Sequence, residues 1–343
     1  MKIIMPILTL SRGGAQRMLA EMANRLADMG HEVTVVIPQH GTVEYPMRCP
    51  VVFRSSSVLT EHDLPAGDVI VSNYYSTVFP AQRASEQGKG LHVRLALCYE
   101  PAFLPDNVTS FASYHVTPRL FVLSRWQQEL VRLNHGVNGR IVPVGVNPDF
   151  YNQHIRGQTG TGPIVSTIIR RPEGGFSAHR GQEYLLEQLA FVKANLPGTV
   201  LRLICPPGEM AVSEGLQSLL RDPRFEIRTP ANDYELCYHY NETDIFVSAS
   251  TYDAGSLPGL EAMRCGAALV TLYAGGNMEY CVHEGNCLMS YRYENRLAGD
   301  IIRLIVNPQL RQQLAAKGED DSWQYTWERS ARIFADGLRE MLY

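Results

Sequence analysis

Short apolar runs of strand length alternate with segments of helical periodicity along the whole 343-residue chain. Strands that are buried on both faces are nearly continuous in apolar residues, and a helix after each strand brings the next strand in parallel. The alternation therefore predicts an α/β protein with doubly wound parallel sheets. We expect strands at residues 2–8, 32–38, 51–54, 68–72, 93–98, 120–124, 140–144, 164–169, 200–205, 225–228, 245–248 and 268–272.

The length of the chain suits two domains, because domains commonly contain about 100 to 200 residues. Turn-forming residues after the strand at 140–144, followed by the glycine- and threonine-rich residues 157–163, mark a boundary. We expect one domain over residues 1–150 and a second over 151–322. Apolar residues recur every three or four positions in 323–343, which predicts a helix with Trp323 and Trp327 in the core.

Composition and charge exclude several classes of protein. No window approaches the ~18 consecutive apolar residues of a membrane span, and we expect no export signal. The net charge of −4 argues against a nucleic-acid-binding protein, which needs clustered lysine and arginine. The seven cysteines are scattered and include no Cys-x-x-Cys pair, so we expect reduced thiols in the cytoplasm and no metal site.

The most informative segment is a turn of small residues after the strand expected at 245–248. Pro258 suits the first turn of a helix, because proline presets φ and lacks an N–H that would have no helical partner there. The free amides at the start of a helix carry partial positive charge and attract anions. Open α/β sheets bind their ligands at this carboxyl edge. The segment therefore predicts a phosphate site with Asp253 and Glu261 beside it.

The run from Asp253 to Glu261 resembles the Glu-x7-Glu motif of the family-4 retaining glycosyltransferases. The chain keeps Leu-Pro-x-Leu-Glu-Ala-Met at 257–263 and has aspartate where the family has its first glutamate. Three further segments follow the family's order: Gly13-Gly14 after the first strand, Pro-Val-Gly-Val-Asn at 143–147, and Gly275-Gly276-x-x-Glu279. The short segment Tyr-Glu-Pro at 99–101 resembles a rhamnosyltransferase-like branch.

The resemblance implies a GT-B fold, in which two Rossmann-like domains face each other across a cleft and the last helix returns to the first domain. The first domain would lie on the acceptor side, and the second would bind the nucleotide sugar. It implies transfer of a hexosyl or deoxyhexosyl group from a nucleoside diphosphate to an acceptor hydroxyl, with retention and without a metal or other cofactor. The acceptor would be a carbohydrate or a lipid-linked molecule, as in the synthesis of a cell-surface polysaccharide or another glycoconjugate. A weak peripheral contact with the inner face of a membrane, and the oligomeric state, stay open.

The resemblance also implies roles for individual residues. Glu261 would bind the ribose hydroxyls, and Asp253 would lie against the transferred sugar. Arg180, with Arg170 or Arg171, would stabilise the diphosphate as it leaves with growing negative charge. The other donor-binding residues are expected to be Gly13, Gly14, Ser256, Leu257, Pro258, Gly275, Gly276 and Glu279. Glu100 would act as a general base toward the acceptor hydroxyl, or else form a salt bridge within the fold.

Two alternatives stay open at the level of sequence. Aspartate at position 253 is one methylene shorter than glutamate, so one alternative is a GT-B protein that binds a nucleotide sugar without turnover. The other is a GT-B nucleotide-sugar epimerase. The sequence names neither the base nor the sugar of the donor, because loops in such folds contact the base largely through backbone atoms.

Overall fold

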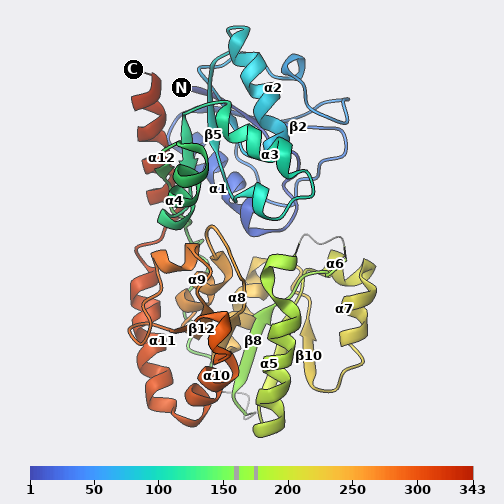
Figure 1. Cartoon of the computed structure of the whole chain (residues 1–343), viewed down its shortest axis with the longest axis vertical. Coiled ribbons are helices and arrows are strands. Elements are labelled where there is room, and N and C mark those ends of the chain that lie inside the picture. The colour runs from blue at the N-terminus through green and yellow to red at the C-terminus, as the bar shows by residue number, and fades with distance from the viewer. Residues whose placement is uncertain (158–161, 174–176, 343) are drawn as a thin grey trace. The chain divides into compact units, whose positions relative to one another are not determined.

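The computed structural model describes residues 1–157, 162–173 and 177–342 and divides the chain into two compact units. Unit 1 consists of Met1–Gly145 with Tyr325–Tyr343, and unit 2 consists of Val146–Gln324 (Figure 1). The sequence predicts these boundaries after residues 150 and 322, whereas the structure divides the chain after Gly145 and Gln324. Most of the glycine- and threonine-rich segment that marks the predicted boundary lies outside the described residues.

Unit 1 is built on a seven-stranded sheet with the strand order β3-β2-β1-β4-β5-β6-β7, and neighbouring strands are parallel. Its strands are β1 (Lys2–Pro6), β2 (Glu32–Ile37), β3 (Val51–Phe53), β4 (Val69–Ser72), β5 (Leu91–Leu95), β6 (Leu120–Val122) and β7 (Arg140–Ile141). Its helices are α1 (Gly14–Asp28), α2 (Tyr75–Glu86), α3 (Asn107–Ala112), α4 (Arg125–His135) and α12 (Trp327–Leu342). A strand is therefore present in each region of this unit where the apolar runs predict one.

Unit 2 contains a six-stranded parallel sheet with the order β10-β9-β8-β11-β12-β13. Its strands are β8 (Ile164–Ile168), β9 (Val200–Ile204), β10 (Phe225–Arg228), β11 (Ile245–Ser248), β12 (Ala268–Leu272) and β13 (Leu288–Ser290). Its helices are α5 (Gln182–Asn195), α6 (Pro207–Val212), α7 (Glu214–Leu219), α8 (Asp233–Glu242), α9 (Leu257–Arg264), α10 (Leu297–Val306) and α11 (Pro308–Ser322). The sequence analysis missed β13, because three buried residues are too few to show a strand period.

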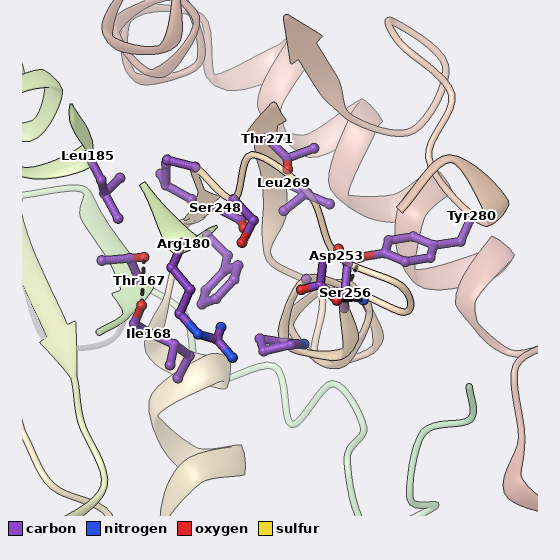
Figure 2. Close-up of a pocket in the computed structure, with 16 residues that line it drawn as sticks. Thr167, Ile168, Arg180, Leu185, Ser248, Asp253, Ser256, Leu269, Thr271 and Tyr280 are labelled. Carbon is purple, nitrogen blue, oxygen red and sulfur yellow. Dashed lines mark hydrogen bonds between the residues drawn. The ribbon is translucent and has the colours of Figure 1, made fainter. Parts of the chain in front are cut away.

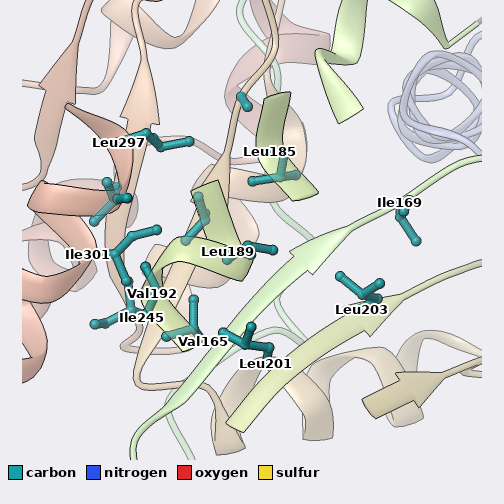
Figure 3. Close-up of a cluster of buried hydrophobic side chains, with 14 of the residues drawn as sticks. Val165, Ile169, Leu185, Leu189, Val192, Leu201, Leu203, Ile245, Leu297 and Ile301 are labelled. Atoms are coloured by element: carbon teal, nitrogen blue, oxygen red, sulfur yellow. The ribbon is translucent and has the colours of Figure 1, made fainter. Parts of the chain in front are cut away.

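The core of unit 2 joins α5 to the sheet. Leu185, Leu189 and Val192 are spaced four and three residues apart, so they lie on one face of the helix and are almost fully buried. They belong to the same cluster as Val165 of β8 and Leu201 of β9 (Figure 3). Burying each such side chain stabilises the fold by about 1.5 to 3 kcal/mol. This packing holds the central strands in place, and with them the loops at their carboxyl ends.

The last helix packs within unit 1. Trp327 is fully buried, and the ring of Phe334 meets that of Phe121 edge to face at 4.7 Å. A Cβ atom on Gly337 would lie 2.6 Å from the Phe121 ring, so a larger residue would prevent this approach. The prediction of a core position was wrong for Trp323, which is 50 % exposed, because α12 begins only at Trp327. No described helix combines the length and the hydropathy that crossing a membrane requires.

Candidate functional site

A pocket lies at the carboxyl edge of the sheet in unit 2, between β8 and β11 (Figure 2). The strand order reverses at this point, since β9 lies on one side of β8 and β11 on the other. Doubly wound sheets bind ligands at such switch points. The pocket is lined by Thr167, Ile168, Arg180, Leu185, Phe246, Val247, Ser248, Ala249, Ser250, Asp253, Ser256, Pro258, Gly259, Leu269, Thr271 and Tyr280.

The turn between β11 and α9 is held by the side chain of Asp253. Its Oδ1 atom accepts hydrogen bonds from the backbone N–H groups of Gly255 at 3.2 Å and Ser256 at 3.0 Å. Ser256 has a left-handed backbone with φ 48°, and Tyr280 donates its hydroxyl to the Ser256 carbonyl at 2.7 Å. These contacts fix the start of α9, whose residue Pro258 lines the pocket. The partial positive charge of the helix terminus therefore lies at the pocket.

The two glycines that follow β12 support this turn from the other side. Asp253 donates its N–H to the Ala274 carbonyl and accepts the N–H of Gly276 at its own carbonyl, both at 2.7 Å. A Cβ atom on Gly276 would lie 2.1 Å from the Ala254 carbonyl oxygen, so only glycine permits this approach. Gly275 has φ 93°, a conformation that favours glycine. The pair contacts the Asp253 turn directly, and its contact with a donor stays a prediction, as does that of the partly exposed Glu279.

Arg180 supplies the positive charge of the pocket. Figure 2 shows its side chain reaching toward Asp253 and Ser256. Within the described part of the chain, its guanidinium makes no hydrogen bond and no ion pair shorter than 4.0 Å. Burial lowers the pKa of Arg180, and the nearby Asp253 carboxylate opposes this effect only in part. A partly desolvated cation without a contacting anion favours the entry of an anionic ligand.

The backbone beside Arg180 is fixed by the turn after β11. The N–H and the hydroxyl of Thr251 both donate to the His179 carbonyl, at 2.7 Å and 3.0 Å. Gly181 has φ 60°, and a Cβ atom there would lie 2.5 Å from the Ala249 carbonyl oxygen. Two segments about 70 residues apart in the sequence are thereby held together, which explains why Arg180 and Asp253 line the same pocket.

The structure does not bring Arg170 and Arg171 into this pocket. The Arg170 guanidinium forms an ion pair with Glu209 of α6, and the second oxygen of that carboxylate accepts the Arg171 N–H at 2.8 Å. Burial alone would raise the pKa of Glu209, but the bonds from these two arginines lower it. The Arg171 side chain is exposed. Arg170 is thus already neutralised, and Arg180 is the member of the predicted group that lines the pocket.

Glu261 lies on α9, four residues after Leu257, and is only 3 % exposed. Its Oε2 atom lies 3.3 Å from the hydroxyl of Tyr240, which donates to it from α8. Neither Glu261 nor Leu257 lines the pocket described above. The binding of ribose hydroxyls by Glu261 therefore stays a prediction. It requires that the ribose reach a carboxylate that is buried in this structure.

The glycines of the first predicted loop lie in unit 1, where α1 begins at Gly14. The N–H of Gly13 donates to the Tyr45 hydroxyl at 3.0 Å, and that hydroxyl donates in turn to the Gly13 carbonyl at 3.1 Å. Tyr45 therefore holds the backbone at the start of the helix. Gly14 is exposed, and a donor contact at this loop stays a prediction.

The hypothesis that Glu100 is a general base needs correction. Glu100 is fully buried, its Oε1 accepts from Arg94 at 2.9 Å, and its Oε2 accepts from the Tyr114 hydroxyl at 2.8 Å. The Arg94 guanidinium also stacks on the Tyr114 ring, 3.8 Å from its centroid, and donates to Ser113 at 2.9 Å. Both carboxylate oxygens are thus occupied inside unit 1. The structure shows the salt bridge that was the alternative to the catalytic role.

Sequence reasoning missed Tyr280, which follows Glu279 directly and fixes the left-handed residue at the start of α9. No sequence signal could have found it, because its partner Ser256 lies 24 residues away and is reached only in the folded unit. The described residues contain no cluster of three or more histidine, cysteine, aspartate or glutamate side chains suited to a metal ion.

The molecule has the GT-B fold, as comparison with solved structures shows. The chain is similar to a sucrose-phosphate synthase of Thermosynechococcus elongatus, with a TM-score of 0.79, 19% identity and 99% of both chains covered. It is similar to the HepE protein of Anabaena, solved with UDP and glucose, with a TM-score of 0.78, 18% identity, and 99% and 100% covered. WaaG, a glycosyltransferase involved in lipopolysaccharide biosynthesis, gives a TM-score of 0.74 at 16% identity over 97% and 98%.

Comparison by sequence gives a match to a protein family within unit 2. Residues 174–321 match the model of a family described as glycosyl transferases group 1. This match includes Arg180, Asp253 and Gly276, so it spans much of the pocket. Among curated proteins, no sequence matches this chain. The solved structures thus show the GT-B fold, and the family match concerns residues 174–321, less than half of the chain.

Proposed function

We propose that this protein is a retaining glycosyltransferase that moves a hexosyl or deoxyhexosyl group from a nucleoside diphosphate to an acceptor hydroxyl. The observation that carries the proposal is the partly buried Arg180, which lines the pocket close to the start of α9 and has no contacting anion among the described residues. A diphosphate provides the charge that this arrangement lacks. The match of residues 174–321 to glycosyl transferases group 1 supports the same chemistry.

In the proposed reaction, the bond between the sugar and the diphosphate breaks, and negative charge grows on the leaving phosphate. Arg180 and the amides of α9 stabilise this charge more in the transition state than in the ground state. The acceptor hydroxyl attacks from the same face and passes its proton to the leaving phosphate, so no nucleophilic side chain is needed. Because Arg180 and the helix terminus supply positive charge, we propose transfer without a metal ion.

Asp253 is proposed to orient the transferred sugar. Its Oδ1 atom is held by the turn, while its Oδ2 atom makes no hydrogen bond within the described residues and lies on a pocket-lining side chain. That oxygen is suited to accept a hydrogen bond from a sugar hydroxyl. Glu261 is proposed as the ribose ligand, which requires the Tyr240 hydroxyl to release or share its carboxylate.

The proposed acceptor is a carbohydrate or a lipid-linked saccharide in the synthesis of a cell-surface polysaccharide or another glycoconjugate. The similarity in fold to WaaG, which takes part in lipopolysaccharide biosynthesis, supports this class of acceptor. We place the reaction in the cytoplasm, and a lipid-linked acceptor would bring the protein to the inner face of the membrane. The seven free cysteines are compatible with that compartment.

The test is a thermal-shift screen with UDP, GDP, TDP and ADP sugars, followed by product analysis. UDP-glucose comes first, because HepE was also solved with this donor. A ligand at about 100 times its dissociation constant stabilises a fold by ~2.7 kcal/mol, which is easily measured. We expect one nucleotide to raise the melting temperature and its sugar to be released or transferred. If no nucleotide sugar binds, the proposal is wrong.

A nucleotide-sugar-binding protein without turnover is the second candidate. It is favoured by one observation, namely that Asp253 uses one carboxylate oxygen to close its own turn. Donor binding without hydrolysis or transfer to any glycoside would indicate this function. Conversion of the donor into its epimer, detected by the same product analysis, would indicate a nucleotide-sugar epimerase.

A further inference from the structure

Three stacked tyrosines lie at the carboxyl edge of the unit 2 sheet, outside the pocket. The rings of Tyr273 and Tyr291 are 4.2 Å apart at 20°, and those of Tyr291 and Tyr293 are 5.4 Å apart at 14°. Tyr291 is 47 % exposed and Tyr293 is 83 % exposed. We call Tyr273, Tyr291 and Tyr293 the tyrosine ladder. Large aromatic rings that are both ordered and exposed indicate a binding surface.

Backbone hydrogen bonds position the residues of the tyrosine ladder. Tyr273 follows β12 and Tyr291 follows β13, and the Tyr273 N–H donates to the Ser290 carbonyl at 3.1 Å. The Tyr291 N–H donates to the Glu294 carboxylate at 2.6 Å, which closes the turn that carries Tyr293. Because the rings already stack on one another, less side-chain freedom remains to be lost on binding.

The ladder is continuous with the candidate site. Tyr273 precedes Ala274, whose carbonyl accepts the Asp253 N–H at 2.7 Å. Arg292, between the two exposed tyrosines, reaches the other side of the pocket. One of its guanidinium nitrogens lies 2.9 Å from where a Cβ atom on Gly181 would stand, directly after Arg180. The ladder therefore adjoins the loops of Asp253 and Arg180, although it does not line the pocket itself.

The position of the ladder indicates whether it would contact the base of the donor or a sugar. We take the base of the donor to lie at the loops after β9 and β10, residues 206–209 and 228–231, whereas the ladder follows β12 and β13. Four strand spacings separate β9 from β13, which amounts to about 19 Å at ~4.8 Å per strand. If the base lies after β9 and β10, the loops after β12 and β13 are too far away to contact it. They are then available to a sugar.

The chemistry of the ladder suits a saccharide. A pyranose ring has an apolar face of C–H groups and a rim of hydroxyls. A tyrosine ring offers a flat apolar face with negative potential, and its phenol hydroxyl both donates and accepts hydrogen bonds. The Tyr291 ring lies beside the Tyr293 ring in an offset stack, and Tyr293 is still 83 % exposed, so most of its surface is open to a ligand.

We propose that the tyrosine ladder is an acceptor subsite, in which a pyranose ring of a carbohydrate acceptor stacks on Tyr293 next to the Asp253 loop. This inference rests on the proposed function, because it takes the adjoining pocket to hold the donor. The inference goes beyond the proposed function, because sugar transfer could take place without a saccharide site at the ladder.

The test uses saturation-transfer NMR on the full chain with methyl glucoside, methyl galactoside and methyl mannoside, each in the presence of UDP. We expect at least one glycoside to receive magnetisation at its ring C–H groups. Tyr293→Ala should weaken that signal about fivefold or more, the scale of one lost aromatic contact. Tyr293→Phe keeps the ring and should retain the signal. Tyr238→Ala removes another exposed tyrosine, 43 % exposed on α8, and is the matched control.

The outcomes separate this inference from the proposed function. The ladder is not an acceptor subsite if no glycoside gives a signal, or if the signal survives Tyr293→Ala unchanged. It holds the donor base instead if Tyr293→Ala abolishes the thermal shift with UDP. If a glycoside binds through Tyr293 but no nucleotide sugar binds the wild-type protein, the proposed function fails while the saccharide site remains.

Discussion

Two arginines, one fully buried in unit 1 and one partly buried in unit 2, differ in how their charge is balanced. Arg94 of unit 1 is 1 % exposed and forms an ion pair with Glu100 at 2.9 Å. Burial by itself would lower the pKa of Arg94, but the carboxylate of Glu100 raises it above its ordinary value. Burial lowers the pKa of Arg180 of unit 2 in the same way, and there the effect of burial prevails.

The difference is that one arginine is paired with an anion inside its own unit and the other is not. The Glu100 carboxylate offsets the cost of desolvating Arg94. Arg94 would destabilise unit 1 if Glu100 were absent. Arg180 has Asp253 in its pocket but makes no ion pair with it, and Asp253 is itself held by its own turn. Arg94 therefore belongs to the fold, whereas Arg180 is the residue proposed to bind an anion.

The largest expected effect concerns the pair in unit 1. Glu100→Ala should lower the free energy of unfolding by about 3 to 5 kcal/mol, because it leaves the Arg94 charge buried without its partner. Urea denaturation measures this loss. The double variant Arg94→Met with Glu100→Leu should recover most of the stability, since it removes both charges. A stable Glu100→Ala protein that no longer transfers sugar would restore the general-base hypothesis.

Removal of the cation in unit 2 should affect turnover and leave stability intact. Arg180→Ala is expected to lower kcat by about 100- to 1,000-fold, the cost of losing one group that stabilises transition-state charge. Its free energy of unfolding should stay the same or rise, because a desolvated charge is removed. Steady-state kinetics and urea denaturation test both parts. Arg221→Ala, an exposed arginine after α7, is the control, and wild-type turnover in Arg180→Ala would place the cation elsewhere.

The buried carboxylate on α9 should affect donor binding. Glu261→Ala is expected to weaken the binding of the preferred nucleoside diphosphate by about 10- to 150-fold, as for a lost charged hydrogen bond of 1.5 to 3 kcal/mol. Isothermal titration calorimetry measures the dissociation constant. Tyr240→Phe removes only the hydroxyl that bonds to Glu261, so it should leave the affinity closer to that of the wild type. An unchanged dissociation constant in Glu261→Ala would remove this residue from the site.

The smallest expected effect is the most specific. Asp253→Asn should lower turnover by at least about tenfold, or 1.4 kcal/mol, because the asparagine keeps the turn and loses the charge beside the sugar. The amide oxygen of asparagine can still accept the N–H groups of Gly255 and Ser256, so nucleotide affinity should hardly change. Kinetic assays with a titrated donor separate the two quantities. Asp253→Ala, which also opens the turn, is the control that should lose stability as well.

Lengthening the same side chain sharpens the test. Asp253→Glu places the carboxylate one methylene farther out, and it should lose the close bonds to the turn. If this variant transfers from a donor that the wild type ignores, position 253 selects the sugar. If turnover survives every change at Asp253, the charge beside the sugar has no role in the reaction.

The strand pattern could be predicted because the physical reason for it is local. A strand covered by helices on both faces must be apolar at almost every position, and that signature survives in the bare sequence. Residues 2–8 and 245–248 show it and form β1 and β11. β13 has only three residues, which is too short a stretch to carry the pattern.

The site could be predicted only in part. Pro258 and the small residues around it indicate a helix start after a strand, and the structure places that start at the pocket. The choice among Arg170, Arg171 and Arg180 could not be made in the same way. It depends on Glu209, which lies 39 residues from Arg170 and neutralises it only once β8 and β9 are paired.

The sequence by itself therefore determined the class of fold and the segment around which the site is built, since burial, helix starts and turns act within a few residues. Only the tertiary structure decided what each charged side chain does. Glu100 follows a strand, where either a base or a salt bridge is compatible with the sequence. The structure favours the salt bridge, because Arg94 and Tyr114 donate to both of its oxygens. A charge acts through whatever lies within a few ångströms of it, and folding determines those neighbours.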